Sequence, residues 1–138
     1  MTQSILSFTK KAVNDYIDHY HDERDKIKRE MDKTYADWYP KTKEEHTKVI
    51  EEIVECSTYD NEEDEWDFDL TDCEFQYLFE SLKTHFDFHD YDYDHGYINW
   101  EENEEEIIER IENNEWKKDV FSQELCRAFK NGPLKKVN

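Results

Sequence analysis

Glycine and proline are scarce in this chain, with only two of each among 138 residues. Tight hairpin turns commonly use glycine where the backbone needs a positive φ, and clusters of either residue mark loops. A chain with so few of them is most easily built from helices joined by short connections. At this length one compact core is expected rather than two. We therefore predict an all-α fold, a compact bundle of about five helices forming a single domain over residues 1–138.

Apolar residues recur at helical spacing in five segments. The first segment runs from Ile5 to Trp38 and stops before Pro40. The other four carry these apolar positions: Val49, Ile50, Ile53 and Val54; Phe75, Leu78, Phe79, Leu82 and Phe86; Ile107, Ile108 and Ile111; Val120, Phe121, Leu125, Ala128 and Phe129. We expect these residues to face the core, and the last helix to end in a left-handed cap at Asn131-Gly132-Pro133.

Three residue pairs have the spacing of a helix-capping box, in which a polar N-cap residue is followed three positions later by glutamate. The pairs are Thr42 with Glu45, Thr71 with Glu74, and Asn99 with Glu102. Each pair directly precedes an apolar periodic segment. The sequence therefore predicts helix starts at these three places.

Charge is distributed far less evenly than the apolar segments. The net charge is −19, yet residues 1–50 hold 10 acidic and 10 basic residues, and residues 110–138 hold 4 acidic and 7 basic. Residues 51–109 hold 23 acidic residues and one lysine, Lys83. A general adaptation to salt, which is the alternative explanation, would spread the excess over residues 1–50 as well. We therefore divide the chain into a charge-balanced helical scaffold (1–50), an acidic interaction region (51–109) and a C-terminal helix (110–138).

The carboxylates of this acidic region are interleaved with aromatic residues, as in DNEEDEWDFDLTDCEF. An acidic disordered tail lacks such aromatic residues, so these carboxylates are expected to be held in a folded surface. Duplex DNA carries about one negative charge per 1.7 Å of its axis, and DNA-binding proteins grip it with arrays of Lys and Arg. A folded field of carboxylates can compete for the same arrays.

In size, charge and helical character the chain resembles the acidic DNA-mimic proteins, which include phage and mobile-element inhibitors of restriction enzymes and CRISPR nucleases, and some nuclease immunity proteins. These proteins share no sequence motif, so the resemblance assigns no functional residue. It implies a non-enzymatic protein that occupies the basic groove of a CRISPR effector, a restriction enzyme or a nuclease without binding nucleic acid itself. The first residues, MTQSILSFTKK, contain no long apolar stretch, so we expect a cytoplasmic location, the host cytoplasm if the protein is phage-encoded.

Within that interpretation, the partner-binding residues are expected to form two anionic strips with aromatic anchors, because Trp and Tyr are enriched where binding energy concentrates. Trp100 is a further candidate anchor, although an aromatic residue just inside a helix start more often lies in the core. The expected partner-binding residues of the first strip are Glu62, Glu63, Asp64, Glu65, Asp67 and Asp69. Those of the second strip are Asp87, Asp90, Asp92, Asp94, Glu101, Glu102, Glu104, Glu105 and Glu106. The expected anchors are Trp66, Tyr91 and Tyr93.

Residues 90–102, DYDYDHGYINWEE, also resemble a calmodulin-like EF-hand loop, with Gly96 at the sharp turn if His95 is treated as an insertion. The insertion lengthens the loop where it tolerates change least, and no convincing partner loop is present. The alternative function is therefore a Ca²⁺-binding, EF-hand-like module. Its ligands would be Asp90, Asp92, Asp94, Asn99 and Glu102.

Signatures of enzymes are missing from the sequence, including a P-loop, a dinucleotide fingerprint, a G-x-S-x-G elbow and an H-E-x-x-H motif. We expect no catalytic activity and no cofactor other than the possible Ca²⁺. A transition-metal site at His85 and His89 is a weaker alternative, because surface histidines beside carboxylates are the more common case. No stretch approaches the roughly 18 apolar residues of a membrane span. Three cysteines without a CxxC pair are expected to be reduced and buried.

Overall fold

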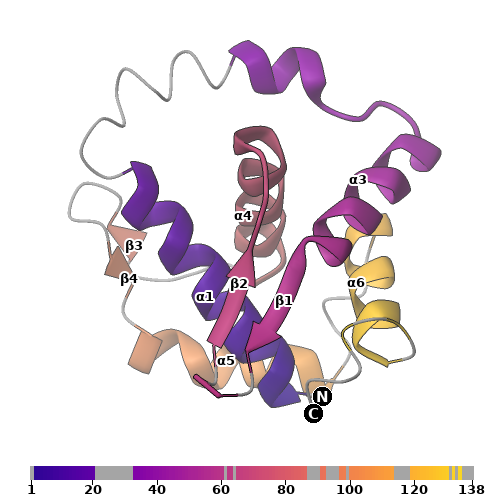
Figure 1. Cartoon of the computed structure of the whole chain (residues 1–138). Helices are drawn as coiled ribbons and strands as arrows, with labels where there is room; N and C mark the ends of the chain where they lie inside the picture. Colours follow the sequence, from indigo (N-terminus) through magenta and orange to yellow (C-terminus); the bar gives the residue numbers. More distant parts are fainter. Residues whose placement is uncertain are drawn as a thin grey trace.

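The computed structural model describes residues 2–20, 33–60, 62–63, 65–86, 91–92, 97–98, 100–113, 119–130, 132 and 134. Its helices are α1 (Thr2–Tyr20), α3 (Lys43–Glu55), α4 (Asp72–Phe86), α5 (Trp100–Glu112) and α6 (Val120–Lys130). Its strands form two antiparallel pairs, β1 (Ser57–Asp60) with β2 (Glu65–Phe68), and β3 (Tyr91–Asp92) with β4 (Tyr97–Ile98). The fold is mostly helical, which confirms the predicted class (Figure 1).

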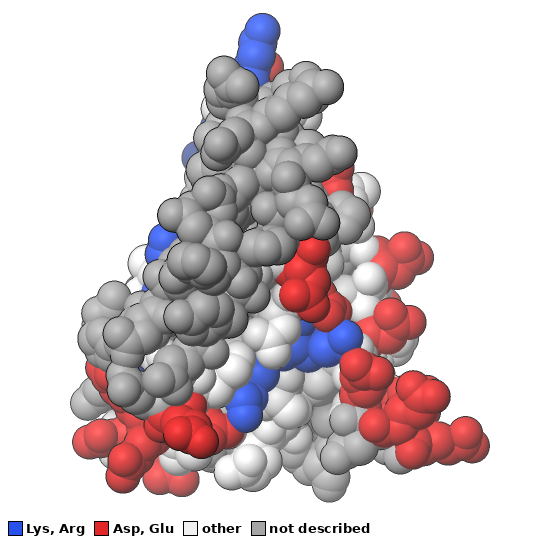
Figure 2. Space-filling model, turned by 90° about the vertical axis from the view of Figure 1, so that its left-hand side faces the viewer, with Lys and Arg blue, Asp and Glu red and all other residues white. Residues whose placement is uncertain are grey.

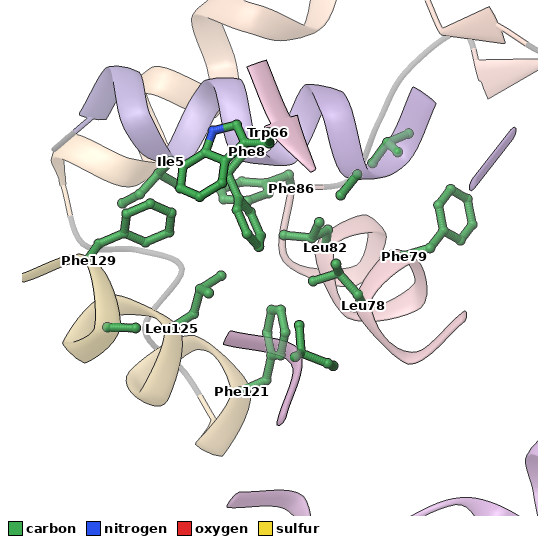
Figure 3. Close-up of a cluster of buried hydrophobic side chains, with 14 of the residues drawn as sticks. Ile5, Phe8, Trp66, Leu78, Phe79, Leu82, Phe86, Phe121, Leu125 and Phe129 are labelled. Carbon is green, nitrogen blue, oxygen red and sulfur yellow. The ribbon is translucent and has the colours of Figure 1, made fainter. Parts of the chain in front are cut away.

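Helix α1 lies at the centre of the fold and packs against α4, α5 and β2, while α3 packs mainly against α6 (Figure 1). Phe8 of α1 is fully buried, and its ring meets three others edge to face. The ring centroids lie 5.1 Å from Trp66, 5.2 Å from Phe68 and 5.5 Å from Phe129. Side chains from α1, β2, α4 and α6 thus converge on one aromatic cluster (Figure 3).

The apolar positions predicted for α3, α4, α5 and α6 do form the core. All of them are buried except four that are half-buried against it: Val49, Phe75, Ile108 and Val120. Helical periodicity therefore identified the buried faces correctly, because each of these helices buries one stripe of its surface.

One of the predicted capping boxes is formed in full and a second is formed in half. In α4 the pair is reciprocal: Glu74 N donates to Thr71 Oγ1 at 3.2 Å, and Thr71 N donates to Glu74 Oε1 at 2.9 Å. In α3, Glu45 N donates to Thr42 Oγ1 at 3.1 Å, but the Glu45 carboxylate accepts from Lys41 N instead of the cap residue. Helix α5 begins at Trp100, as expected, and the cap residue predicted before it lies outside the described residues.

Helix α6 ends at Lys130, where the sequence predicts a stop. Gly132 N donates back to Ala128 O at 3.2 Å, and a Cβ at Gly132 would lie 2.9 Å from Ala128 Cα. Glycine is therefore required here because a side chain would collide with the backbone of Ala128. The φ angle of Gly132 is not in the left-handed region, so this angle is not the reason. Asn131 and Pro133 of the predicted cap lie outside the described residues.

The single helix predicted from Ile5 to Trp38 is wrong. The structure describes α1 up to Tyr20, and the helical residues 33–38 run in a different direction (Figure 1). Trp38 packs against α4 instead, with its ring 6.1 Å from that of Tyr77. A periodic apolar pattern cannot distinguish one long helix from two shorter ones that bury their faces in the same core.

The β1–β2 hairpin was not predicted, because its turn does without glycine. Asp60 Oδ1 accepts a hydrogen bond from Glu62 N at 2.9 Å, the side-chain-to-backbone contact that aspartate makes in tight turns. Residues 65–70 alternate acidic and apolar side chains, EWDFDL, and this period of two is the strand signal in the sequence. The scarcity of glycine therefore predicted a mostly helical fold correctly. It did not predict the hairpin, because the turn of this hairpin uses an aspartate side chain and no glycine.

We predict that Phe8→Ala lowers the free energy of unfolding by about 3–5 kcal/mol, because it removes a fully buried ring that contacts three others. Urea denaturation followed by tryptophan fluorescence measures this loss. Gln3→Ala, an exposed position on the same helix, should change stability by less than about 0.5 kcal/mol. Comparable losses in the two variants would show that Phe8 is not central to the core.

Candidate protein-binding surface

The first predicted strip forms the outer face of the β1–β2 hairpin. Side chains alternate across a strand, so Glu65 and Asp67 point outward and are exposed. Asp60 of β1 lies directly opposite Glu65 in the antiparallel register, which puts two carboxylates side by side. Glu62 and Glu63 are exposed in the turn. A hollow of about 720 Å³ lies against this face, lined by Lys11, Thr58, Tyr59, Asp60, Glu62, Glu63, Glu65, Trp66 and Asp67.

Trp66 was expected to be a surface anchor, and this expectation is wrong. Its side chain is only 2% exposed, because the strand alternation that turns Glu65 and Asp67 outward turns Trp66 inward. Its indole N–H donates to Ser7 Oγ at 3.0 Å, which fastens the hairpin to α1. Trp66 therefore supports the acidic strip from below instead of contacting a partner.

The glutamates of the second predicted strip lie on α5, where they differ in their surroundings. Glu101 and Glu105 are exposed, and Glu109, which the predicted strip did not include, continues the same face at a spacing of four residues. Glu104 and Glu106 are half-buried and are paired with cations. The strip available to a partner is therefore narrower than predicted, and it extends further along α5.

Two lysines of α1, which were predicted to belong to the charge-balanced scaffold, lie between the strips. Lys10 Nζ forms an ion pair with Glu104 of α5, while Lys11 Nζ lies 2.9 Å from Glu65 of β2 and 2.8 Å from Asp15. In Figure 2, basic side chains separate two groups of acidic side chains on one face of the molecule. The structure thus brings the two strips to opposite flanks of α1 without merging them.

Trp100, the other candidate anchor, is half-buried where α5 meets α1. Its indole N–H donates to Asn14 Oδ1 at 3.1 Å, and Lys10 Nζ lies 5.8 Å from the centre of its ring. These contacts brace α5 on α1, so Trp100 has a structural role like that of Trp66.

A second acidic hollow, of about 470 Å³, lies beside α1 and the start of α4. Asp15, Asp18, Leu70, Asp72 and Phe75 line it. Burial raises the pKa of Asp15, and the hydrogen bond from Lys11 opposes this shift. These aspartates were not predicted to line a site, because Asp15 and Asp18 lie in a segment whose total charge is balanced. The signal present in the sequence was their spacing of three residues on one helix.

Several predicted residues cannot be placed. Tyr91, Asp92 and Glu102 have described backbones but no described side chains. Those outside the described residues are Asp64, Asp87, Asp90, Tyr93, Asp94 and, of the calcium ligands, Asn99. Tyr91 and Asp92 pair with Ile98 and Tyr97, so the segment that resembles an EF-hand loop contains a short antiparallel strand pair. The calcium-binding alternative stays a prediction.

Within the part of the chain that the structure describes, no group of three or more His, Cys, Asp or Glu side chains could hold a metal ion. His85 is buried, in contrast to the surface position expected for it. Its Nε2 lies 3.1 Å from both carboxylate oxygens of Asp119, and its ring stacks on Phe121. This contact joins the end of α4 to the residue before α6. His89 lies outside the described residues.

The three cysteines are free thiols. Cys126 is buried, as expected, whereas Cys56 and Cys73 are half-buried. Burial, together with nearby carboxylates, raises the pKa of Cys56 and of Cys73. Both thiols therefore stay protonated at neutral pH, in the form that is a poor nucleophile.

Comparisons with protein-family models, curated proteins and solved structures find no match to this chain. Among the described residues, no helix combines the length and the apolar character needed to cross a bilayer. Function is therefore inferred from the charge and geometry of the surface alone.

We predict that Glu105→Gln stabilises the free protein. Glu105 lies four residues from both Glu101 and Glu109, and like charges at this spacing cost about 0.2–0.5 kcal/mol per pair. The free energy of unfolding should rise by up to about 1 kcal/mol at low salt and by less at 1 M salt, where charges are screened. Thermal or urea denaturation at the two salt concentrations measures this difference.

The matched control is Glu44→Gln, because Glu44 lies four residues before Lys48 on α3 and has an attractive neighbour. It should leave stability unchanged or lower it slightly. A gain from Glu105→Gln that is equally large at 1 M salt would contradict the role of repulsion on α5.

A carboxyl pair at the junction of α3 and α4 predicts a pH dependence. The hydrogen bond between Glu52 and Glu74, which requires a proton, and the repulsion between them raise the pKa of Glu52. The folded state therefore favours protonated Glu52, so the stability from this pair is present below pH 4.5 and is lost as pH rises through the raised pKa.

Glu52→Gln, which stays neutral, should accordingly gain stability relative to the unmodified protein as pH rises from 4 to 7. The gain should be below about 1 kcal/mol, because Glu52 is exposed to solvent. Urea denaturation at several pH values measures it. A stability difference that does not change with pH would show that the two carboxyl groups do not share a proton.

Proposed function

We propose that this protein is a non-enzymatic inhibitor that presents fixed carboxylates to the basic groove of a nucleic-acid-binding protein and excludes DNA or RNA by competition. The observation that supports this proposal is the arrangement around α1. Exposed carboxylates of the hairpin lie on one flank and those of α5 lie on the other, with buried Trp66 beneath the hairpin and half-buried Trp100 bracing α5 on α1.

The fixed position of these carboxylates is what distinguishes them from a flexible polyanion. Glu65 and Asp67 belong to a strand whose alternate residues are packed on Phe8, and Glu65 is held by Lys11 as well. A partner therefore does not have to order these groups when it binds, which lowers the entropic cost of association. Phosphates of a duplex are likewise held at fixed spacing by their backbone.

Repulsion between neighbouring carboxylates gives the second reason to expect a basic partner, although Lys11 already pairs with Glu65. Asp60 faces Glu65 across the hairpin, and the exposed glutamates of α5 repeat every four residues. Like charges in these positions destabilise a sheet or a helix. A groove of Lys and Arg would relieve this repulsion, and its positive field would attract the acidic surface over long range. CRISPR effectors, restriction enzymes and other nucleases present such grooves.

The proposal is tested by neutralising the hairpin strip. In the test variant, Glu62, Glu63 and Glu65 are replaced by Gln and Asp67 by Asn. The control variant changes the same number of exposed carboxylates elsewhere, with Glu44 and Glu112 replaced by Gln and Asp18 and Asp37 by Asn. Both variants have the same net charge, so any difference between them reflects the location of the carboxylates.

Immobilised wild-type protein is used to capture a partner from host lysate, and the affinity of that partner is then measured with and without duplex DNA. We expect DNA to compete with the protein, and the test variant to bind at least about tenfold more weakly than the control. The salt dependence of binding should also become shallower in the test variant, because fewer ion pairs form. A captured partner that DNA does not displace, or equal affinities of the two variants, would contradict the proposal.

A further inference from the structure

A groove of about 160 Å³ lies between α3 and α6, which pack against each other (Figure 1). Its apolar lining residues are Ile50 and Val54 of α3 and Ala128 of α6, and because all three are buried they form its floor. The small side chain of Ala128 leaves space that a longer one would fill. The volume is close to the roughly 150 Å³ of an engineered apolar cavity that holds one benzene molecule. The floor therefore has room for about one aliphatic side chain.

Charged residues form the rim of this α3–α6 groove. On α6, Arg127 Nη1 lies 3.0 Å from Glu124 Oε1, so these two residues neutralise each other. On α3, Glu51 and Glu55 are both exposed and lie four residues apart, a spacing at which like charges repel. No described residue, Lys48 of the same helix included, forms an ion pair with either glutamate. The rim is therefore negative on its α3 side.

An apolar floor beside a negative rim selects among possible occupants. A purely apolar ligand would cover the two glutamates without supplying a cation. Nucleic acid and anionic lipid would be repelled by them. A second copy of the chain carries the same net charge of −19, and among the described residues its one exposed large apolar side chain is that of Tyr39, an aromatic residue. A basic protein segment that carries an aliphatic side chain meets both requirements.

We propose that the α3–α6 groove binds a basic segment of a partner protein, with one leucine or isoleucine side chain on the floor and flanking Lys or Arg side chains paired with Glu51 and Glu55. Burial of the aliphatic side chain anchors the segment. The ion pairs add charge complementarity and relieve the repulsion between the two glutamates. This contact uses α3 and α6, whereas the carboxylate surface uses the hairpin and α5, so the groove does not rest on the proposed function.

The experiment uses the full chain at low salt and three capped pentapeptides: Ala-Lys-Leu-Lys-Ala, Ala-Lys-Ser-Lys-Ala and Ala-Glu-Leu-Glu-Ala. NMR titration follows the methyl signals of Ile50, Val54 and Ala128. We expect saturable shifts of these signals with the first peptide. The serine peptide should bind at least about threefold more weakly, because it has no aliphatic side chain to bury. The acidic peptide should cause no saturable shift, because its glutamates are repelled by the rim.

Two matched double variants locate the site. Glu51→Gln/Glu55→Gln removes both carboxylates from the α3 side of the rim, and Glu44→Gln/Glu112→Gln makes the same change of charge at exposed positions that do not line the groove. Because exposed ion pairs contribute little individually, the first variant should weaken binding of the lysine–leucine peptide by about two- to tenfold. The second should leave this binding unchanged.

Several results would overturn this assignment of the groove: equal weakening in both variants, equal binding of the leucine and serine peptides, saturable binding of the acidic peptide, or no shift of the floor methyl signals. Shifts of these signals with protein concentration alone would assign the groove to a second copy instead. If the peptide does not bind but the protein still competes with DNA for its partner, only the groove proposal is wrong. If the peptide binds as expected but DNA competition is absent, the groove stands and nucleic-acid mimicry is wrong.

Discussion

The edge-to-face contact of Phe8 with Trp66 is the interaction on which the rest of the surface depends. It fixes the β1–β2 hairpin to the central helix, and the hydrogen bond from Trp66 to Ser7 sets the orientation of the indole. Because side chains alternate along a strand, the inward direction of Trp66 determines the direction of its two neighbours. Glu65 and Asp67 must face solvent. The acidic face of the hairpin is therefore a consequence of how the aromatic core is packed.

Attraction and repulsion are closely balanced around α1. Lys10 and Lys11 each hold a carboxylate of a neighbouring element, and these contacts connect α1 to α5 and to β2. Such half-exposed ion pairs contribute little individually, so the buried aromatic and aliphatic side chains must supply most of the stability. The remaining carboxylates have no comparable relief within the described surface of the hairpin turn and the outer face of α5. A surface of this kind is suited to a partner that brings its own cations.

The helices, their buried faces and two of their caps could be predicted from the sequence because these features depend on local spacing. The different direction of residues 33–38 could not, because Tyr35 and Trp38 continue the apolar period of α1 while Trp38 packs with another helix, through its contact with Tyr77. The hairpin was missed because its turn uses Asp60 in place of glycine. The ion pairs of Lys10, Lys11 and Asp15 could not be predicted for another reason. A charge count along the chain cannot show which segments fold against one another.

The central claim is that fixed carboxylates, and not negative charge alone, block a basic groove. Its most direct test compares wild-type protein with the Phe8→Ala/Trp66→Ala double variant, which keeps the net charge of −19 but loses the packing beneath the hairpin. The quantity to measure is the concentration of each that halves DNA binding by the captured partner. We predict that this concentration is at least about tenfold higher for the variant than for the wild-type protein. Equal inhibition by the two proteins would contradict the account, because it would mean that a disordered polyanion acts as well as the folded surface.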